Sequence, residues 1–84
     1  MPGARKGSVQ IRFEILEHLY YNSKPQPRTH VWRKATTLSY DDFQKHIAYL
    51  VERGYLTESE AGLEITAQGR DVYDRLKNVL GTLL

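Results

Sequence analysis

The sequence contains no cysteine, so disulfide bonds, thiolate catalysis and cysteine-ligated zinc sites are all excluded. Three histidines are present, but they lie in different expected elements and share no metal-ligand spacing. Glu14 and His18 are four residues apart on one expected helix, a spacing that ordinary helix neighbours explain without a metal. We therefore expect no metal site and no cofactor.

Long apolar runs are also lacking. No segment approaches the roughly 20 apolar residues that a membrane-spanning helix requires, and residues 1–6 lack the apolar stretch of a signal peptide. The sequence carries neither a Ser/His/Asp constellation nor a metal-binding or phosphate-loop motif. It therefore predicts a soluble cytoplasmic protein that has no membrane partner and is not an enzyme.

The chain does contain enough apolar residues for one small core, because 40% of its 84 residues are hydrophobic and 26% are charged. This length excludes a second domain. The net charge is only +2, but it is unevenly spread: residues 1–45 hold eight Lys and Arg against four Asp and Glu, a balance of +4, and the remainder carries −2. An excess of basic residues in one half is typical of a moderate DNA binder.

Apolar residues at helical spacing predict three helices in the first two thirds of the chain. After a flexible basic arm over residues 1–7, we expect a helix over residues 8–22, a proline-containing loop, and a second helix over residues 28–36. Ser39 is expected to cap a third helix and Gly54 to end it. The inward-facing residues are expected to be Ile11, Ile15, Leu16 and Leu19, then Val31, Trp32 and Ala35, and finally Phe43, Ile47, Leu50 and Val51.

The helical spacing then gives way to short strand-like runs. Residues 55–57 and 63–65 predict a hairpin with a loop over residues 58–62, and Thr66 is expected to cap a last helix over residues 67–83. The fold class is therefore mainly α with a small β-hairpin, in the order helix, helix, helix, strand, strand, helix. Two short helices joined by a tight turn and followed by a hairpin define the winged helix-turn-helix arrangement.

Several short motifs accompany this order, namely Arg28-Thr29-His30-Val31, Leu38-Ser39-Tyr40, Tyr49-Leu50, Gly54-Tyr55-Leu56 and Leu63-x-Ile65-Thr66-x-x-Gly69. They resemble archaeal winged-helix proteins, both small transcriptional regulators and the related ten-kilodalton chromatin-type proteins. The resemblance covers about residues 9–80 of the single domain expected over residues 8–84. It implies binding of double-stranded DNA, with the third helix in the major groove, and a homodimer formed through the C-terminal helix. His46 departs from the pattern, since relatives often have tyrosine there.

The basic-Thr pair formed by Arg28 and Thr29 matches the start of the family's second helix, where free N–H groups also attract phosphate. On the outer face of the third helix, Gln44 can form a bidentate pair with adenine. The alternative is that these polar residues only form the water-exposed face of a surface helix. Arg12 is expected to add to the basic surface. The expected DNA-binding residues are Arg28, Thr29, Arg33, Lys34, Ser39, Tyr40, Gln44, Lys45, Arg5 and Lys6.

The last helix repeats apolar residues at spacings that suit a coiled-coil seam, although the same stripe can cover the domain's own core. We favour the homodimer, with an interface formed by Val72, Tyr73, Leu76, Val79, Leu80 and Leu83.

The expected hairpin is acidic, since it carries Glu58, Glu60 and Glu64, whereas a wing that grips phosphate normally offers Lys or Arg. The carboxylates of Asp41 and Asp42 would also repel phosphate, although acidic residues are favourable at the N-terminus of a helix. The leading hypothesis is a nucleoid-associated DNA-binding protein, either a transcriptional regulator or an architectural protein. The alternative is a protein–protein interaction adaptor built on the same scaffold.

Overall fold

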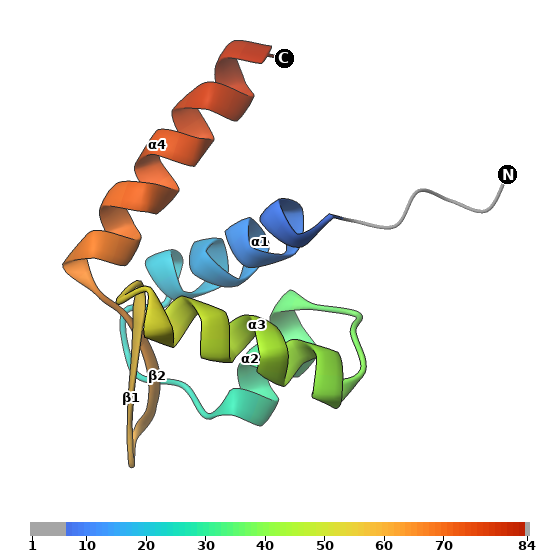
Figure 1. The fold of residues 1–84 in the computed structure, drawn as a ribbon. Helices are drawn as coiled ribbons and strands as arrows, with labels where there is room; N and C mark the ends of the chain where they lie inside the picture. The colour runs from blue at the N-terminus through green and yellow to red at the C-terminus, as the bar shows by residue number, and fades with distance from the viewer. Residues whose placement is uncertain (1–6, 84) are drawn as a thin grey trace, which may run out of the picture.

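The computed structural model describes residues 7–83 and shows helices and one hairpin packed around a single core (Figure 1). The expected fold class and element order are confirmed. No helix within this range is long and apolar enough to cross a membrane. The elements are α1 (Ser8–Tyr21), α2 (Arg28–Ala35), α3 (Tyr40–Glu52), β1 (Leu56–Ser59), β2 (Gly62–Ile65) and α4 (Ala67–Leu83).

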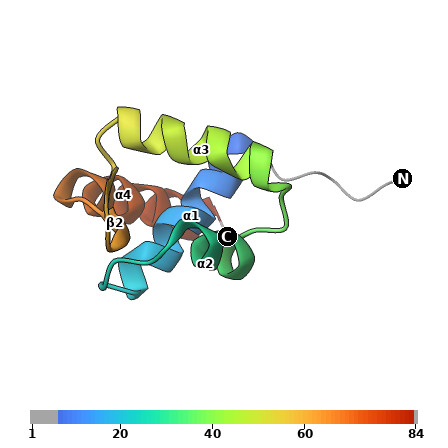
Figure 2. The ribbon, with the colours of Figure 1, turned by 90° about the horizontal axis from the view of Figure 1, so that it is seen from below.

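Helix α1 lies at the centre of the domain and packs on more than one face. Figure 1 shows it between α4 on one side and α2 with α3 on the other, and in the view of Figure 2 it passes between α3 and α2. Helix α1 contacts all three helices and β2. Ile15, Leu16 and Leu19 are buried as expected. Phe13, which the expected apolar face omits, is buried too, because its ring stacks on Tyr73 of α4 with 5.0 Å between the ring centroids.

The turn between α2 and α3 is held by side-chain hydrogen bonds to the backbone. Helix α2 ends one residue earlier than expected, because Thr36 adopts an extended conformation with φ −139° and ψ 165°. The Thr36 hydroxyl donates to the Trp32 carbonyl at 2.9 Å, and the Trp32 indole N–H donates to the Leu38 carbonyl at 2.7 Å. Trp32 is half-buried against the core, in agreement with its expected role in packing, and its hydrogen bond stabilises the turn.

Both ends of α3 carry the expected signals. Ser39 Oγ accepts the Asp42 N–H at 3.2 Å, which caps the start of the helix. Gly54 has φ 80°, and its N–H and that of the following residue donate to carbonyls of the last turn, which is a Schellman motif. The expectation that Val51 faces inward is wrong, because it lies outside the buried stripe of α3 and is 38% exposed.

The hairpin is longer and its turn tighter than the sequence predicts. Strands β1 and β2 pair antiparallel with Ser59 opposite Gly62, so only Glu60 and Ala61 form the turn. The expected loop over residues 58–62 is therefore too long, because polar residues in this segment pair as strand.

Gly62 also connects the hairpin to the loop before α2. Its φ of 128° suits glycine, and a Cβ at this position would collide with the backbone of Gln26. The backbone groups of Gln26 and Leu63 exchange hydrogen bonds of 3.0 and 2.7 Å. The end of the hairpin next to its turn is thereby fixed beside the N-terminus of α2.

The start of α4 is set by Thr66, as expected. Its hydroxyl accepts the Gly69 N–H at 3.0 Å and donates to the Gly54 carbonyl at 2.6 Å. Gly69 permits a close approach between α4 and the chain before β1, since a Cβ there would collide with the Tyr55 carbonyl. One hydroxyl thus links the end of α3 to the start of α4.

Tyr73 lies in the core of the domain, which corrects its expected place in a dimer interface. Its side chain is 0% exposed. The Tyr73 ring packs against Phe13 and also against Tyr20, with 4.6 Å between the centroids of the Tyr73 and Tyr20 rings. Its hydroxyl donates to Glu17 Oε2 at 2.8 Å. Burial raises the pKa of the Tyr73 phenol, and the hydrogen bond to Glu17 raises it further.

Replacing Tyr73 with alanine should therefore detach α4 from α1. We expect Tyr73→Ala to lower the free energy of unfolding by about 3–5 kcal/mol, the range for large buried aromatic residues. Tyr73→Phe, which keeps the ring but loses the hydroxyl and its hydrogen bond to Glu17, should cost about 1 kcal/mol. Urea denaturation followed by circular dichroism measures both. Arg75→Ala, at an exposed position of α4 outside the expected dimer interface, is the control, and equal losses for Tyr73→Ala and Arg75→Ala would contradict the packing role.

Candidate nucleic-acid interface

The outer face of α3 is the surface that the sequence assigned to a DNA groove. Because Phe43, Ile47 and Leu50 face the core, the opposite side of the helix is open to solvent. Lys45 lies near its centre with a side chain that is 81% exposed, and its Nζ lies 4.0 Å from Asp42 Oδ1. An exposed ion pair this long contributes little, so Lys45 can exchange it for another anion. The exposed residues of α3 are Asp41, Asp42, Lys45, Ala48, Val51 and Glu52.

Ser39 and Tyr40, at the start of α3, both have structural roles. Ser39 uses its oxygen as the helix cap, which leaves its hydroxyl hydrogen for another partner. The Tyr40 ring is half-buried and meets Trp32 edge-on, with 5.1 Å between the centroids. Their contact with DNA stays a prediction.

Arg28 makes the most extensive side-chain contacts of the expected site. Its Nε and Nη2 donate to the two carboxylate oxygens of Glu58 on β1, each at 2.8 Å. Its Nη1 donates to Gln44 Oε1 on α3 at 3.3 Å. The guanidinium lowers the pKa of Glu58, and the hydrogen bond to Glu58 raises the pKa of Arg28. A phosphate would have to compete with Glu58 for Arg28, so the phosphate-binding role of Arg28 stays a prediction.

The remaining expected phosphate ligands lie on α2 or in the arm. Thr29, Arg33 and Lys34 are exposed on α2, and the Arg33 guanidinium lies 6.0 Å from the centroid of the Trp32 ring. These cations lie on the surface of the helix that precedes the turn. Arg5 and Lys6 lie outside the described residues.

The net charge differs between individual helices and the hairpin as well as between the two halves of the chain. Arg5 and Lys6 account for the net +2, since residues 7–83 hold ten Lys and Arg and ten Asp and Glu. Within that range α2 carries +3, α3 carries −2, and the hairpin with its turn carries −3. The basic surface of the described residues is therefore α2, and it borders an acidic hairpin.

A second cluster lies at the contact between α1 and α3, and the sequence did not predict it. The Arg12 guanidinium stacks on the Tyr49 ring at 3.6 Å from the centroid, and Arg53 approaches the same ring at 4.9 Å. Arg12 Nε donates to His46 Nδ1 at 3.2 Å, which requires that nitrogen to be unprotonated. Burial lowers the pKa of His46, and the charge of Arg12 lowers it further. Spacing along α3 could have shown that His46 and Tyr49 lie one turn apart, but not that Arg12 joins them.

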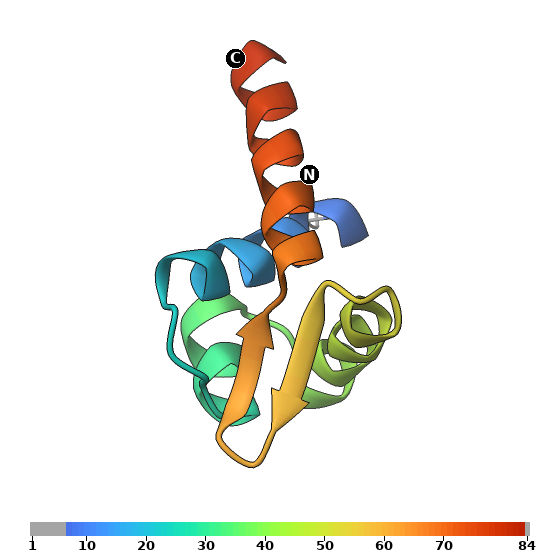
Figure 3. The ribbon, with the colours of Figure 1, turned by 90° about the vertical axis from the view of Figure 1, so that its left-hand side faces the viewer.

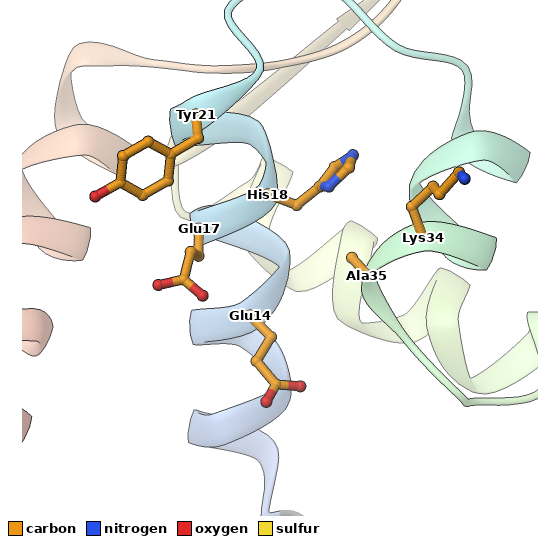
Figure 4. A pocket seen from close by; sticks show the side chains of 6 residues that line it. All are labelled: Glu14, Glu17, His18, Tyr21, Lys34 and Ala35. Atoms are coloured by element: carbon orange, nitrogen blue, oxygen red, sulfur yellow. The ribbon is translucent and has the colours of Figure 1, made fainter.

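A hollow of about 410 Å³ lies between α1 and α2 (Figure 4). Figure 4 shows His18 on the side of α1 that faces α2, whereas Tyr21 points away from α2. His18 Nε2 lies 2.8 Å from Gln26 Oε1, and Glu17 accepts the Tyr73 hydroxyl. Within residues 7–83, no three histidine or carboxylate side chains are grouped to hold a metal ion. The lining residues are Glu14, Glu17, His18, Tyr21, Lys34 and Ala35.

Comparison with known families gives one clear result. A family model described as winged helix-turn-helix matches residues 5–83, which is nearly the whole chain. Comparison with curated proteins and with solved structures gives no match.

The burial of His46 and its contact with Arg12 together predict a pH dependence of stability. Because the pKa of His46 is lower in the folded protein than in the unfolded chain, protonation favours unfolding. The contribution is fully present above the unfolded pKa of about 6.5 and is lost as the pH falls through the lower folded pKa.

We therefore expect the urea midpoint to fall more between about pH 7.5 and about pH 5 in the wild type than in His46→Gln, which cannot titrate there. The control is His30→Gln, at an exposed position on α2, which should follow the wild type. Parallel profiles for the wild type and His46→Gln would exclude the coupling.

Proposed function

Because the chain belongs to the winged helix-turn-helix family, we propose that it binds double-stranded DNA with α3 in the major groove. The observation that carries the proposal is the outer face of α3, where Asp41, Lys45 and Ala48 are exposed in the structure of residues 7–83. In this arrangement the second helix of the motif reads the groove while the helix before it crosses the backbone.

The contacts divide into those that position the protein and those that read bases. On α2, Thr29, Arg33 and Lys34 would bind phosphate, together with Arg5 and Lys6 of the arm. On α3, Gln44 would reach a base edge and Lys45 would bind a phosphate beside the groove, and Ser39 and Tyr40 would lie near the backbone at the start of the helix.

The low net charge favours a protein that acts through specific sites. Binding of random DNA rests on phosphate contacts, and residues 7–83 carry equal numbers of basic and acidic residues. A cytoplasmic, nucleoid-associated transcriptional regulator would therefore bind one DNA site clearly more tightly than random sequence. An architectural protein would instead show binding that depends on salt and tolerates any sequence.

A protein–protein interaction adaptor is the second candidate, and one observation favours it. The hairpin carries −3, and Glu58 occupies the guanidinium that would otherwise meet phosphate. An adaptor would present this acidic surface and α3 to a basic partner protein.

A homodimer through α4 completes the proposal. Figures 1 and 3 show the C-terminal half of α4 projecting beyond the rest of the domain. Val79 and Leu80 lie on this part and are 57% and 36% exposed, while Val72 and Leu76 are half-buried against the core. The side chain of Leu83 lies outside the described residues. A two-fold dimer would present two copies of α3 to major grooves about 34 Å apart.

Neutralising Lys45 should weaken DNA binding, because its side chain is exposed at the centre of the proposed interface. Arg75→Ala is a matched control, since Arg75 on α4 is also exposed, at 77% against 81% for Lys45, and also pairs with a carboxylate on its own helix. We expect Lys45→Ala to lower affinity for a labelled random duplex and to reduce the slope of log K against log salt by about 0.9. Fluorescence anisotropy at several salt concentrations measures both.

Arg75→Ala should leave both quantities close to the wild-type values. Equal effects of the two substitutions would mean that α3 is not the interface. If the wild type fails to bind duplex DNA even at low salt, the adaptor becomes the better hypothesis.

Replacing the exposed apolar residues of α4 tests the dimer. Val79→Glu with Leu80→Glu should yield a monomer with an unchanged fold, because both side chains project from the domain and charge at a buried helix seam is unfavourable. Light scattering after size exclusion gives the mass. Arg75→Glu, an exposed change on the same helix, should leave the mass unaltered. A wild type that is already monomeric at high concentration would remove the dimer from the proposal.

A further inference from the structure

Three elements meet at one partly buried corner of the proposed interface. Arg28 begins α2, Gln44 lies in the first half of α3, and Glu58 lies on β1. The guanidinium binds both oxygens of Glu58 at 2.8 Å, and the side chains of this pair are 30% and 35% exposed. A bidentate pair of this kind has a fixed geometry, so the guanidinium has little freedom to rotate.

The third contact of Arg28 determines which way the Gln44 amide faces. A guanidinium has only donors, so the group that Gln44 presents at 3.3 Å from Nη1 must be its oxygen. The Gln44 Nε2 therefore points to the other side of the amide. No residue within 7–83 accepts a hydrogen bond from this nitrogen.

We infer that Gln44 reads guanine through its amide nitrogen and that Glu58 sets this preference by holding Arg28. The inference rests on the proposed DNA binding and deepens it. It proposes guanine in place of the expected pairing of Gln44 with adenine. Adenine offers an acceptor and a donor in the major groove, so reading it takes both ends of the amide, whereas guanine offers two acceptors, O6 and N7.

Glu58 is a positioning residue in this scheme, since it touches no base. When Glu58 has no charge, the Arg28 guanidinium loses its two charge-assisted hydrogen bonds and can turn toward phosphate. Gln44 Oε1 is then released, and the amide can present both its oxygen and its nitrogen to adenine. The acidic hairpin thus has a role in base selection that does not require it to bind phosphate.

The test is selection of preferred sites from a pool of random duplexes by the wild type, Gln44→Ala, Glu58→Gln and Glu60→Gln. Gln44→Ala identifies the base pair that Gln44 reads, because that position loses its preference. At that position the wild type should select G·C over A·T by about tenfold, the scale of one good base contact. Glu58→Gln should reduce this preference or turn it toward A·T.

Glu60→Gln is the matched control, because it removes the same charge from the exposed turn of the same hairpin, where Glu60 does not contact Arg28. It should select the wild-type sequence. A wild-type preference for A·T at the Gln44 position, no position affected by Gln44→Ala, or equal preferences in Glu58→Gln and the wild type would each overturn the inference.

Two further measurements separate the possible failures. A nitrogen-15 NMR spectrum of the free protein should show the Arg28 Nε–H shifted and protected in the wild type and in Glu60→Gln, and neither shifted nor protected in Glu58→Gln. If this signal behaves as expected but the wild type binds no duplex at low salt, the proposed function fails. If duplex binding is strong but the signal is unprotected in the wild type, the inference alone fails.

Discussion

The burial of α1 on more than one face is the constraint on which the domain depends. A chain of 84 residues without cysteine has a small core and no covalent cross-link to support it. Placing one helix between α4 and the α2 and α3 pair lets a few large side chains serve both layers. Phe13 stacks on Tyr73 toward α4, while Ile15, Leu16 and Leu19 complete the core. The positions of α3 and α4 both follow from their packing on this helix.

This packing decides which surfaces remain available. Helix α3 buries Phe43, Ile47 and Leu50, so it turns its mixed-charge face outward beside α2. Helix α4 is anchored through Tyr73 near its start, and its later turns project with Val79 and Leu80 exposed. The surface proposed to bind DNA and the surface proposed to bind a second copy of the chain therefore lie on different elements.

The corner formed by Arg28, Gln44 and Glu58 connects α2, α3 and β1. The same ion pair that joins the hairpin to α2 also orients a side chain on α3. An acidic residue on a wing is unfavourable for phosphate binding, but it is well suited to holding a guanidinium in one geometry. The charge of the hairpin thus has a structural explanation that is compatible with DNA binding.

Local signals in the sequence determined the order of elements and several of their ends. Ser39, Gly54 and Thr66 act through bonds to groups a few residues away, so their roles follow from spacing alone. Only the tertiary structure decided that Tyr73 is buried and that Arg28 binds Glu58. A stripe of apolar residues on α4 has the same spacing whether it faces α1 or a partner, and Arg28 and Glu58 are 30 residues apart. Spacing along the chain specifies each helix and turn, whereas contacts between distant residues depend on how the helices pack around α1.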